Sequence, residues 1–235
     1  MLKGFLTDNI WRRVFLLSVL LFLTIIGIST WQSKHLFREP EEIVRSGLDN
    51  LEGAQAYAYD LTALSIIDGK ELLLTQVEGI WNAPDRYYIK GETLGNFLEA
   101  YVIGDVYMIK DPQDNWLEFQ ASQGPSLLRE TVLFSQTPLQ DLRGFHSGQV
   151  TGEKTIAGQK CYILEGRLAK VSNPLWQAFW QDFACQLWID KKGLRLRRLA
   201  LSGKSMGSDD RLTVNMEIYD YDTQMIITPP KTKEN

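Results

Sequence analysis

The longest uncharged stretch of this chain lies close to its N-terminus and constrains how the rest can be arranged. Residues 14–28 read VFLLSVLLFLTIIGI, and Trp11 and Trp31 stand on either side of them. A helix from Trp11 to Trp31 would be about 30 Å long at about 1.5 Å per residue, which matches the hydrocarbon core of a bilayer. Tryptophan is enriched where a bilayer meets water. The stretch therefore predicts a transmembrane anchor over residues 14–31.

The charges before this stretch predict its orientation. Arg12 and Arg13 precede it directly and Lys3 lies further back, whereas Asp8 is the only acidic residue among the first 13. Positively charged flanks stay in the cytoplasm. We therefore expect a single-pass protein of the cell membrane, with residues 1–13 in the cytoplasm and the main domain outside it. Residues 32–39 form a short neck that keeps this domain near the bilayer.

A cleaved signal peptide is the alternative interpretation of the N-terminal segment. The basic start and the apolar centre fit it, but no small-x-small site follows the apolar run, which continues into Ser29, Thr30 and Trp31. The first cysteine is Cys161, so none stands nearby for lipid attachment. A buried core helix is disfavoured because every side of this helix is apolar. These observations favour an uncleaved signal anchor.

The remaining composition suits one extracytoplasmic domain. Roughly 200 residues follow the anchor, enough for a single sizeable core. The formal net charge is −4, which excludes a strongly basic nucleic-acid binder. We place the domain at residues 40–230 and a polar tail at residues 231–235.

Residue patterns predict one helix followed by many short strands. Pro40, Glu41 and Glu42 suit a helix start, and helical apolar spacing continues to Leu51 before Gly53. From Ala54 the apolar period becomes two, and strand-length segments are separated by turn dipeptides, which are Asp68-Gly69, Gly104-Asp105 and Ala157-Gly158. A sheet of about ten strands must curl. We therefore expect an α+β fold, a curved antiparallel half-barrel with helices covering its concave face.

Two segments in the second half of the chain have patterns that predict a helix and a β-bulge. Asn173 and Pro174 suit the start of a helix over residues 174–183, whose apolar residues share one helical face. In the strand near residues 194–201, the apolar parity changes between Leu196 and Leu199. Such a change of face predicts a β-bulge.

The order of elements resembles the lipoprotein-carrier superfamily, the group of LolA-like and LppX-like bacterial proteins. The resemblance rests on the segments 79–86 (GIWNAPDR), 187–197 (LWIDKKGLRLR) and 219–230 (YDYDTQMIITPP) and spans roughly residues 40–230. It implies an open half-barrel whose helices close an apolar cavity that receives acyl chains. The predicted anchor departs from freely diffusing carriers. No functional residue of the family can be matched position by position.

Aromatic residues are the candidate lining of such a cavity. The helix 174–183 would contribute Leu175, Trp176, Phe179 and Trp180, and the strands would contribute Trp81, Tyr88, Tyr101 and Trp116. The alternative for all eight is that they pack the core of the curled sheet, because apolar residues at such spacing are usually core.

The two cysteines leave two alternatives open. Cys161 and Cys185 could form a disulfide in an oxidising compartment. If they stand on two strands of one hairpin centred near residue 176, they would be roughly 20 Å apart at about 3.3 Å per residue, beyond disulfide reach. A different placement of the helix 174–183 would bring them together. Unbonded, they are small buried apolar residues.

Catalytic and metal-binding signatures are absent from the sequence. His35 stands beside the predicted anchor and His146 in a predicted loop, so they form no pair for a metal or a proton transfer. No G-x-S-x-G, H-E-x-x-H or C-x-x-C motif occurs. Gly203-Lys204-Ser205 is similar to the end of a phosphate loop, but Arg198 stands where the first glycine is needed. We expect no enzyme, no metal and no cofactor.

Two functions fit these observations. The first is a membrane-tethered binding module of the cell envelope that holds or passes on a lipid or another apolar ligand. The alternative is an envelope sensor or adaptor that binds a partner protein, with its cavity filled by its own side chains. The expected partners are therefore an acyl-chain ligand, the membrane through the N-terminal helix, and an envelope protein in the alternative, with no nucleic acid.

Overall fold

A computed structural model describes residues 39–120, 139, 141–171 and 174–230 of the chain. Residues 40–235 form one compact unit. None of the helices in the described ranges combines the length and apolar character needed to cross a bilayer. The predicted anchor at residues 14–31 and nearly all of the neck lie outside the described residues.

The first described helix, α2 (Pro40–Glu52), has the predicted bounds. Ile43, Val44 and Leu51 are buried, which confirms that one side of this helix packs on the domain. The N–H of Gly53 donates a 2.9 Å hydrogen bond to the carbonyl of Asp49 where the helix ends.

Within the described residues, eleven strands form one antiparallel sheet. They are β1 (Ala56–Ile67), β2 (Lys70–Asn82), β3 (Arg86–Thr93), β4 (Asn96–Ile103), β5 (Val106–Lys110), β6 (Trp116–Gln120), β7 (Phe145–Ile156), β8 (Gln159–Leu168), β9 (Trp180–Asp190), β10 (Leu196–Ser205) and β11 (Arg211–Tyr219). Their order in the sheet is β6-β5-β4-β3-β2-β1-β11-β10-β9-β8-β7. Two meanders, β1–β6 and β7–β11, are thus joined where β1 pairs with β11.

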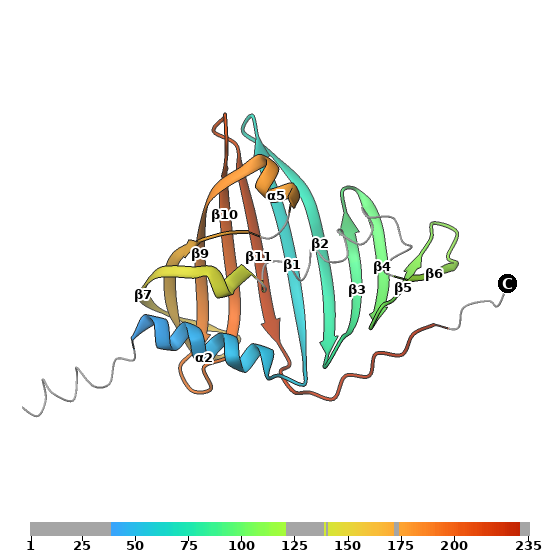
Figure 1. Ribbon diagram of the computed structural model, residues 1–235, viewed down its shortest axis with the longest axis horizontal. Coiled ribbons are helices and arrows are strands. Elements are labelled where there is room, and N and C mark those ends of the chain that lie inside the picture. The colour runs from blue at the N-terminus through green and yellow to red at the C-terminus, as the bar shows by residue number, and fades with distance from the viewer. Residues whose placement is uncertain (1–38, 121–138, 140, 172–173, 231–235) are drawn as a thin grey trace, which may run out of the picture. The chain divides into compact units, whose positions relative to one another are not determined.

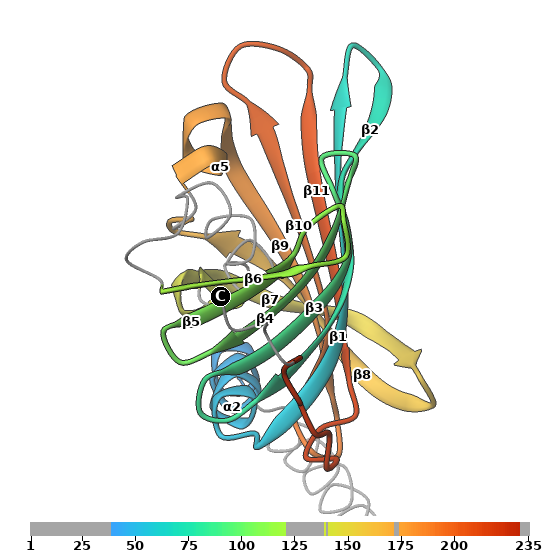
Figure 2. The same ribbon diagram turned by 90° about the vertical axis from the view of Figure 1, so that its right-hand side faces the viewer.

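The sheet is curved, and helices α2 and α5 lie on its concave side (Figures 1 and 2). Helix α2 contacts β7, β9 and β10, and helix α5 (Pro174–Phe179) contacts β9. The predicted half-barrel with helices on its concave face is confirmed for the described residues, with eleven strands where about ten were expected.

The predicted turn dipeptides connect consecutive strands. Asp68 and Gly69 have φ values of 51° and 74°, and Ala157 and Gly158 have 44° and 78°. Positive φ at both positions is the backbone of the tight turns that match strand twist. Gly104, with φ of 57°, starts the turn between β4 and β5. These hairpins were therefore correctly predicted.

The predicted helix over residues 174–183 is too long. Helix α5 ends at Phe179, and β9 begins at Trp180, which pairs with Ser205. Gln181 pairs with Lys204 in the same ladder. Pairing with β10 satisfies the backbone of these residues, and aromatic side chains suit strands at least as well as helices. The apolar spacing of residues 180–183 suits a helix, but their pairing with β10 makes them part of a strand.

The β-bulge predicted in β10 is present. The β9–β10 register shifts between Leu196 and Arg198, and the shift lets Leu196, Leu199 and Leu201 all be buried. A second shift lies between Ser202 and Lys204.

Cys161 and Cys185 are free, buried thiols. Cys161 is opposite Asp190, whereas Cys185 is opposite Gly166. They are therefore separated by about 17 Å along the β8–β9 pair at about 3.3 Å per residue. The two cysteines are therefore out of register and form no disulfide, which was the second alternative.

Candidate functional site

The concave face, by which we mean the side of the sheet that carries α2 and α5, is apolar across both meanders. One continuous cross-strand row on this face consists of Ile109, Ala100, Ile89, Gly79, Tyr59 and Ile218. A second set from the other meander, Leu164, Leu187, Leu199 and Met216, belongs to the same buried cluster.

The outer face is different in character. One position along from Tyr59, on the outer side, a cross-strand row reads Glu99, Lys90, Glu78, Asp60, Glu217 and Arg198. Every one of these side chains is charged. Along these rows the sheet therefore has an apolar inner side and a charged outer side, which is the division expected for an antiparallel sheet with one covered side.

An aromatic cluster closes the end of the concave face next to the start of β1. Tyr57 stacks on Trp81 with ring centroids 4.9 Å apart, and Tyr221 lies 6.0 Å from Tyr57. Burial raises the pKa of Tyr57, so its hydroxyl stays neutral at ordinary pH. Trp81 is thus placed on the concave face, as predicted, but against other aromatic side chains.

A second aromatic cluster lies at the opposite end, around α5. Trp176 is buried and stacks with Phe183 at 6.4 Å. The Phe183 ring lies over Gly203, where a β carbon would be 2.7 Å from it. Trp180 is half-buried, and the side chain of Phe179 is 62% exposed. The side chain of Leu175 lies outside the described part of the structure.

These two clusters are far apart. Trp81 pairs with Tyr57 on β1, whereas the ladders from Trp180 and Gln181 lead through Lys204 and Arg211 to Ile66 at the other end of β1. The separation along the strands is about 30 Å at about 3.3 Å per residue. The predicted aromatic residues mark the two ends of a long apolar face and do not gather in one compact pocket.

Tyr88, Tyr101 and Trp116 lie on the outer face and so do not line the same cavity as Trp81. Tyr88 is opposite Tyr101, with ring centroids 4.8 Å apart, and Tyr101 lies 5.2 Å from Trp116. The structure therefore does not bring these three together with Trp81, because side chains alternate along a strand, and Tyr87, directly before Tyr88, is the partner of Trp81. The Tyr88 hydroxyl donates a 3.1 Å hydrogen bond to Glu99, which also pairs with Lys110 at 3.3 Å.

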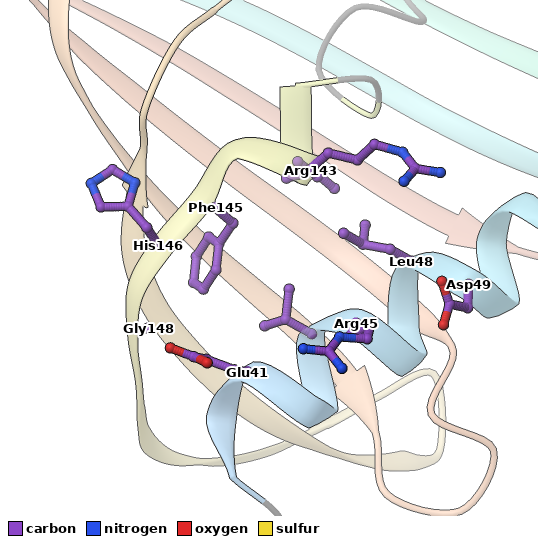
Figure 3. Close-up of a pocket in the computed structure, with 10 residues that line it drawn as sticks. Glu41, Arg45, Leu48, Asp49, Arg143, Phe145, His146 and Gly148 are labelled. Carbon is purple, nitrogen blue, oxygen red and sulfur yellow. The ribbon is translucent and has the colours of Figure 1, made fainter.

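A pocket of about 310 Å³ opens between α2 and the start of β7 (Figure 3). Its lining consists of Glu41, Val44, Arg45, Leu48 and Asp49 from α2, together with Leu142, Arg143, Phe145, His146 and Gly148. The sequence does not predict this α2–β7 pocket, because no local pattern indicates that α2 packs beside β7.

Two glycines hold one wall of the α2–β7 pocket in place. A β carbon on Gly166 would lie 2.6 Å from the Phe145 ring, and one on Gly148 would also collide with it. The ring therefore occupies a slot that only these glycines leave open. With Val44 and the fully buried Leu142, Phe145 forms an apolar floor.

The rim of the α2–β7 pocket is charged. Glu41, Arg45 and Asp49 follow one another at spacings of four along α2, and all three are exposed. Arg143 approaches Leu48 and Asp49 from above the helix in Figure 3 and forms an ion pair with Glu52. His146 points away from α2 and has its Nδ1 3.1 Å from the carbonyl of Gly144.

The described ranges hold no group of three His, Cys, Asp or Glu side chains arranged to bind a metal ion. The buried carboxylate of Asp190 is used structurally, since it accepts hydrogen bonds from Arg197 at 3.1 Å and from the N–H of Gly193 at 2.5 Å.

No family model matches the sequence, and no curated protein matches it. Among solved structures, the chain is similar to the lipoprotein LppX of Mycobacterium tuberculosis, with 16% identity, a TM-score of 0.57, and 80% of this chain and 97% of that chain covered. It is also similar to LprF from Mycobacterium bovis, with 14% identity, a TM-score of 0.58, and coverages of 82% and 98%. At these identities the likeness concerns the fold. The domain therefore shares the fold of LppX and LprF, as the sequence resemblance predicted.

Proposed function

We propose that the domain is a binding module that holds a lipid or another apolar ligand on its concave face, outside the cytoplasm and tethered by residues 14–31. The observation that carries the proposal is the contrast between the two faces of the sheet. An uninterrupted apolar row through Ile89 and Tyr59 lies behind a row of charged residues through Lys90 and Asp60. An acyl chain moved from water onto such a face gains about 0.8 kcal/mol per buried CH₂.

The likeness to LppX and LprF supports this proposal through the fold. LppX is described as a lipoprotein. The lipoprotein-carrier resemblance of the sequence implies a cavity for acyl chains in this fold. The long apolar face, with an aromatic cluster at each end, suits an elongated ligand better than a compact one.

One observation favours a second function. Tyr57, Trp81 and Tyr221 already cover one another, and Trp176 covers Phe183. A concave face that is filled by the domain's own side chains fits a protein that binds a partner protein in the cell envelope and holds no ligand. The adaptor is therefore the alternative that an experiment must separate from the lipid carrier.

Native mass spectrometry of the full chain, extracted in mild detergent, tests the proposal. We expect co-purifying lipid in the unaltered protein and less lipid in the variant Trp180→Ala, whose half-buried side chain lies at the α5 end of the concave face. Trp116→Ala is the matched control, because Trp116 is also half-buried but lies on the outer face. Thermal unfolding establishes that both variants fold.

Protein that is consistently empty of lipid would contradict the carrier and favour the adaptor. Equal lipid loss in Trp180→Ala and Trp116→Ala would contradict the assignment of the concave face. The tether is tested separately, by a protease added to intact spheroplasts, which should digest the domain from outside if it is extracytoplasmic.

A further inference from the structure

We propose that the α2–β7 pocket binds the headgroup end of the lipid, and that it selects a zwitterionic phospholipid with a primary ammonium group. This inference rests on the proposed lipid-binding function and names its ligand class. It starts from the composition of the α2–β7 pocket, which combines an apolar floor with a rim that carries both signs of charge.

The floor provides a place for the first methylene groups of an acyl chain. Val44 and Leu142 are buried, and Phe145 is fixed in its slot between Gly148 and Gly166. The volume of about 310 Å³ lies at the lower end of the range of ligand pockets. It therefore suits part of a lipid, with the remainder on the apolar concave face that continues from Leu142 and Val44 in the same buried cluster.

The rim charges alternate in sign along one side of α2. Glu41, Arg45 and Asp49 present negative, positive and negative charge, and no ion pair among the described residues engages any of the three. Arg143 adds a second guanidinium, which the ion pair with Glu52 holds at the rim. The four charged lining residues thus carry no net charge, yet each sign is available to a ligand.

A zwitterionic headgroup is complementary to this arrangement. A phosphate binds well to guanidinium groups, which offer paired N–H donors, so Arg45 and Arg143 are its partners. A primary ammonium group has three N–H donors and finds acceptors in the carboxylates of Glu41 and Asp49. An anionic headgroup without an ammonium could reach the same guanidinium groups, but it would offer no N–H donor to the carboxylates of Glu41 and Asp49.

Competition between lipids tests this assignment. The full chain in detergent is incubated with equal amounts of dioleoyl phosphatidylethanolamine and dioleoyl phosphatidylglycerol, and the bound lipid is identified by native mass spectrometry. We expect the unaltered protein to prefer phosphatidylethanolamine by about twofold to fivefold, the range that partly exposed ion pairs produce. The double variant Glu41→Lys with Asp49→Lys should reverse the preference, and Arg45→Glu should weaken the binding of both lipids.

Glu42→Lys is the matched control, because Glu42 is exposed on the same helix but does not line the pocket. It should leave the lipid ratio unchanged. If lipid binds but the ratio does not respond to the double variant, the headgroup lies elsewhere and this inference is wrong, while the proposed function stands. If no lipid binds to the unaltered protein, the proposed function itself fails. Binding of free phosphoethanolamine as tightly as the lipid would contradict the role given to the apolar floor.

Discussion

The ring of Tyr59 lies over Gly79, its direct partner across the β1–β2 pair, and fills the space that a side chain at position 79 would need. Tyr59 is almost completely buried in the middle of the concave face. A glycine opposite an aromatic residue is a known way to seat a ring on a sheet. The Tyr59–Gly79 pair therefore sets the shape of the concave face at its centre.

Replacing this glycine should destabilise the domain. In Gly79→Ala the new methyl group displaces the Tyr59 ring from a packed core, and we expect a loss of about 1–3 kcal/mol in the free energy of unfolding, measured with urea. Gly152→Ala is the control, because its β carbon would meet Ile163 at an ordinary 3.8 Å. It should change stability by no more than about 0.5 kcal/mol. Equal losses in the two variants would show that strand glycines in general, and not the ring, set the cost.

Helix α2 should be sensitive to size at Gly47. A β carbon there would lie 2.8 Å from Cδ1 of Ile189, the end of a flexible side chain. Gly47→Ala should therefore cost little, since alanine also favours helix by about 1 kcal/mol. Gly47→Leu adds a larger side chain than a movement of Ile189 can accommodate. It should therefore lower the free energy of unfolding by about 1–3 kcal/mol. Glu42→Leu, on the exposed side of α2, should not produce this loss; if it does, helix packing on β9 is not the cause.

Stability should fall at alkaline pH in a way that Asp60 controls. Burial first, and then the hydrogen bond donated to Asp60 at 3.1 Å and the charge of that carboxylate, raise the pKa of Tyr219 to about 12. An unfolded tyrosine ionises near pH 10. Between about pH 10 and about pH 12 the unfolded chain therefore loses a proton that the folded chain keeps, and the stability that is fully present below this window is lost as the pH rises through it.

The variant Asp60→Asn separates this contribution from that of other tyrosines. Without the carboxylate charge the pKa of Tyr219 should fall, so the free energy of unfolding should decline less steeply above about pH 10 than in the unaltered protein. Urea unfolding at several alkaline pH values, with absorbance titration of the tyrosines, measures both quantities. Identical slopes would show that Asp60 does not contribute to the raised pKa of Tyr219.

Both thiols should be unreactive in the folded protein. Burial raises the pKa of Cys185 and, together with the charge of Asp190, that of Cys161, so neither forms the reactive thiolate. Ellman's reagent should find no accessible thiol in native protein and both thiols after unfolding in guanidinium. A mass two protons lower, with no thiol released on unfolding, would contradict the free cysteines.

The parts of the fold that local chemistry determines could be predicted from the sequence. Helix α2 begins at a proline followed by two glutamates, and the turns at Asp68-Gly69 and Ala157-Gly158 need positive φ, which these residue types tolerate. The change of parity near Leu196 indicated the bulge for the same reason, because it depends only on alternation within one strand.

Features that depend on pairing between distant segments could not be predicted. Residues 180–183 have an apolar spacing that suits a helix, and only β10 turns them into a strand. The sequence predicts part of the placement of Trp81 and Tyr88 on opposite faces. Tyr87 and Tyr88 are adjacent in a strand, so their side chains must point to opposite faces of the sheet. Which of them accompanies Trp81 depends on the β2–β3 register. The α2–β7 pocket forms only where α2 and β7 pack together, and no local sequence pattern indicates that these two segments are neighbours.

The join between β1 and β11 has a consequence for how the protein is made. Strands β1–β6 can form hairpin by hairpin as the chain emerges, because each pairs with its neighbour in sequence. The free edge of β1, however, stays unpaired until residues 211–219 are synthesised, after all the other strands of the sheet. A chain cut short before this point exposes an unpaired edge in the centre of its sheet, where Leu61 and Ala63 lie, and such an edge recruits other chains. Loss of β11 should therefore lead to aggregation, although this strand is far from either border of the sheet.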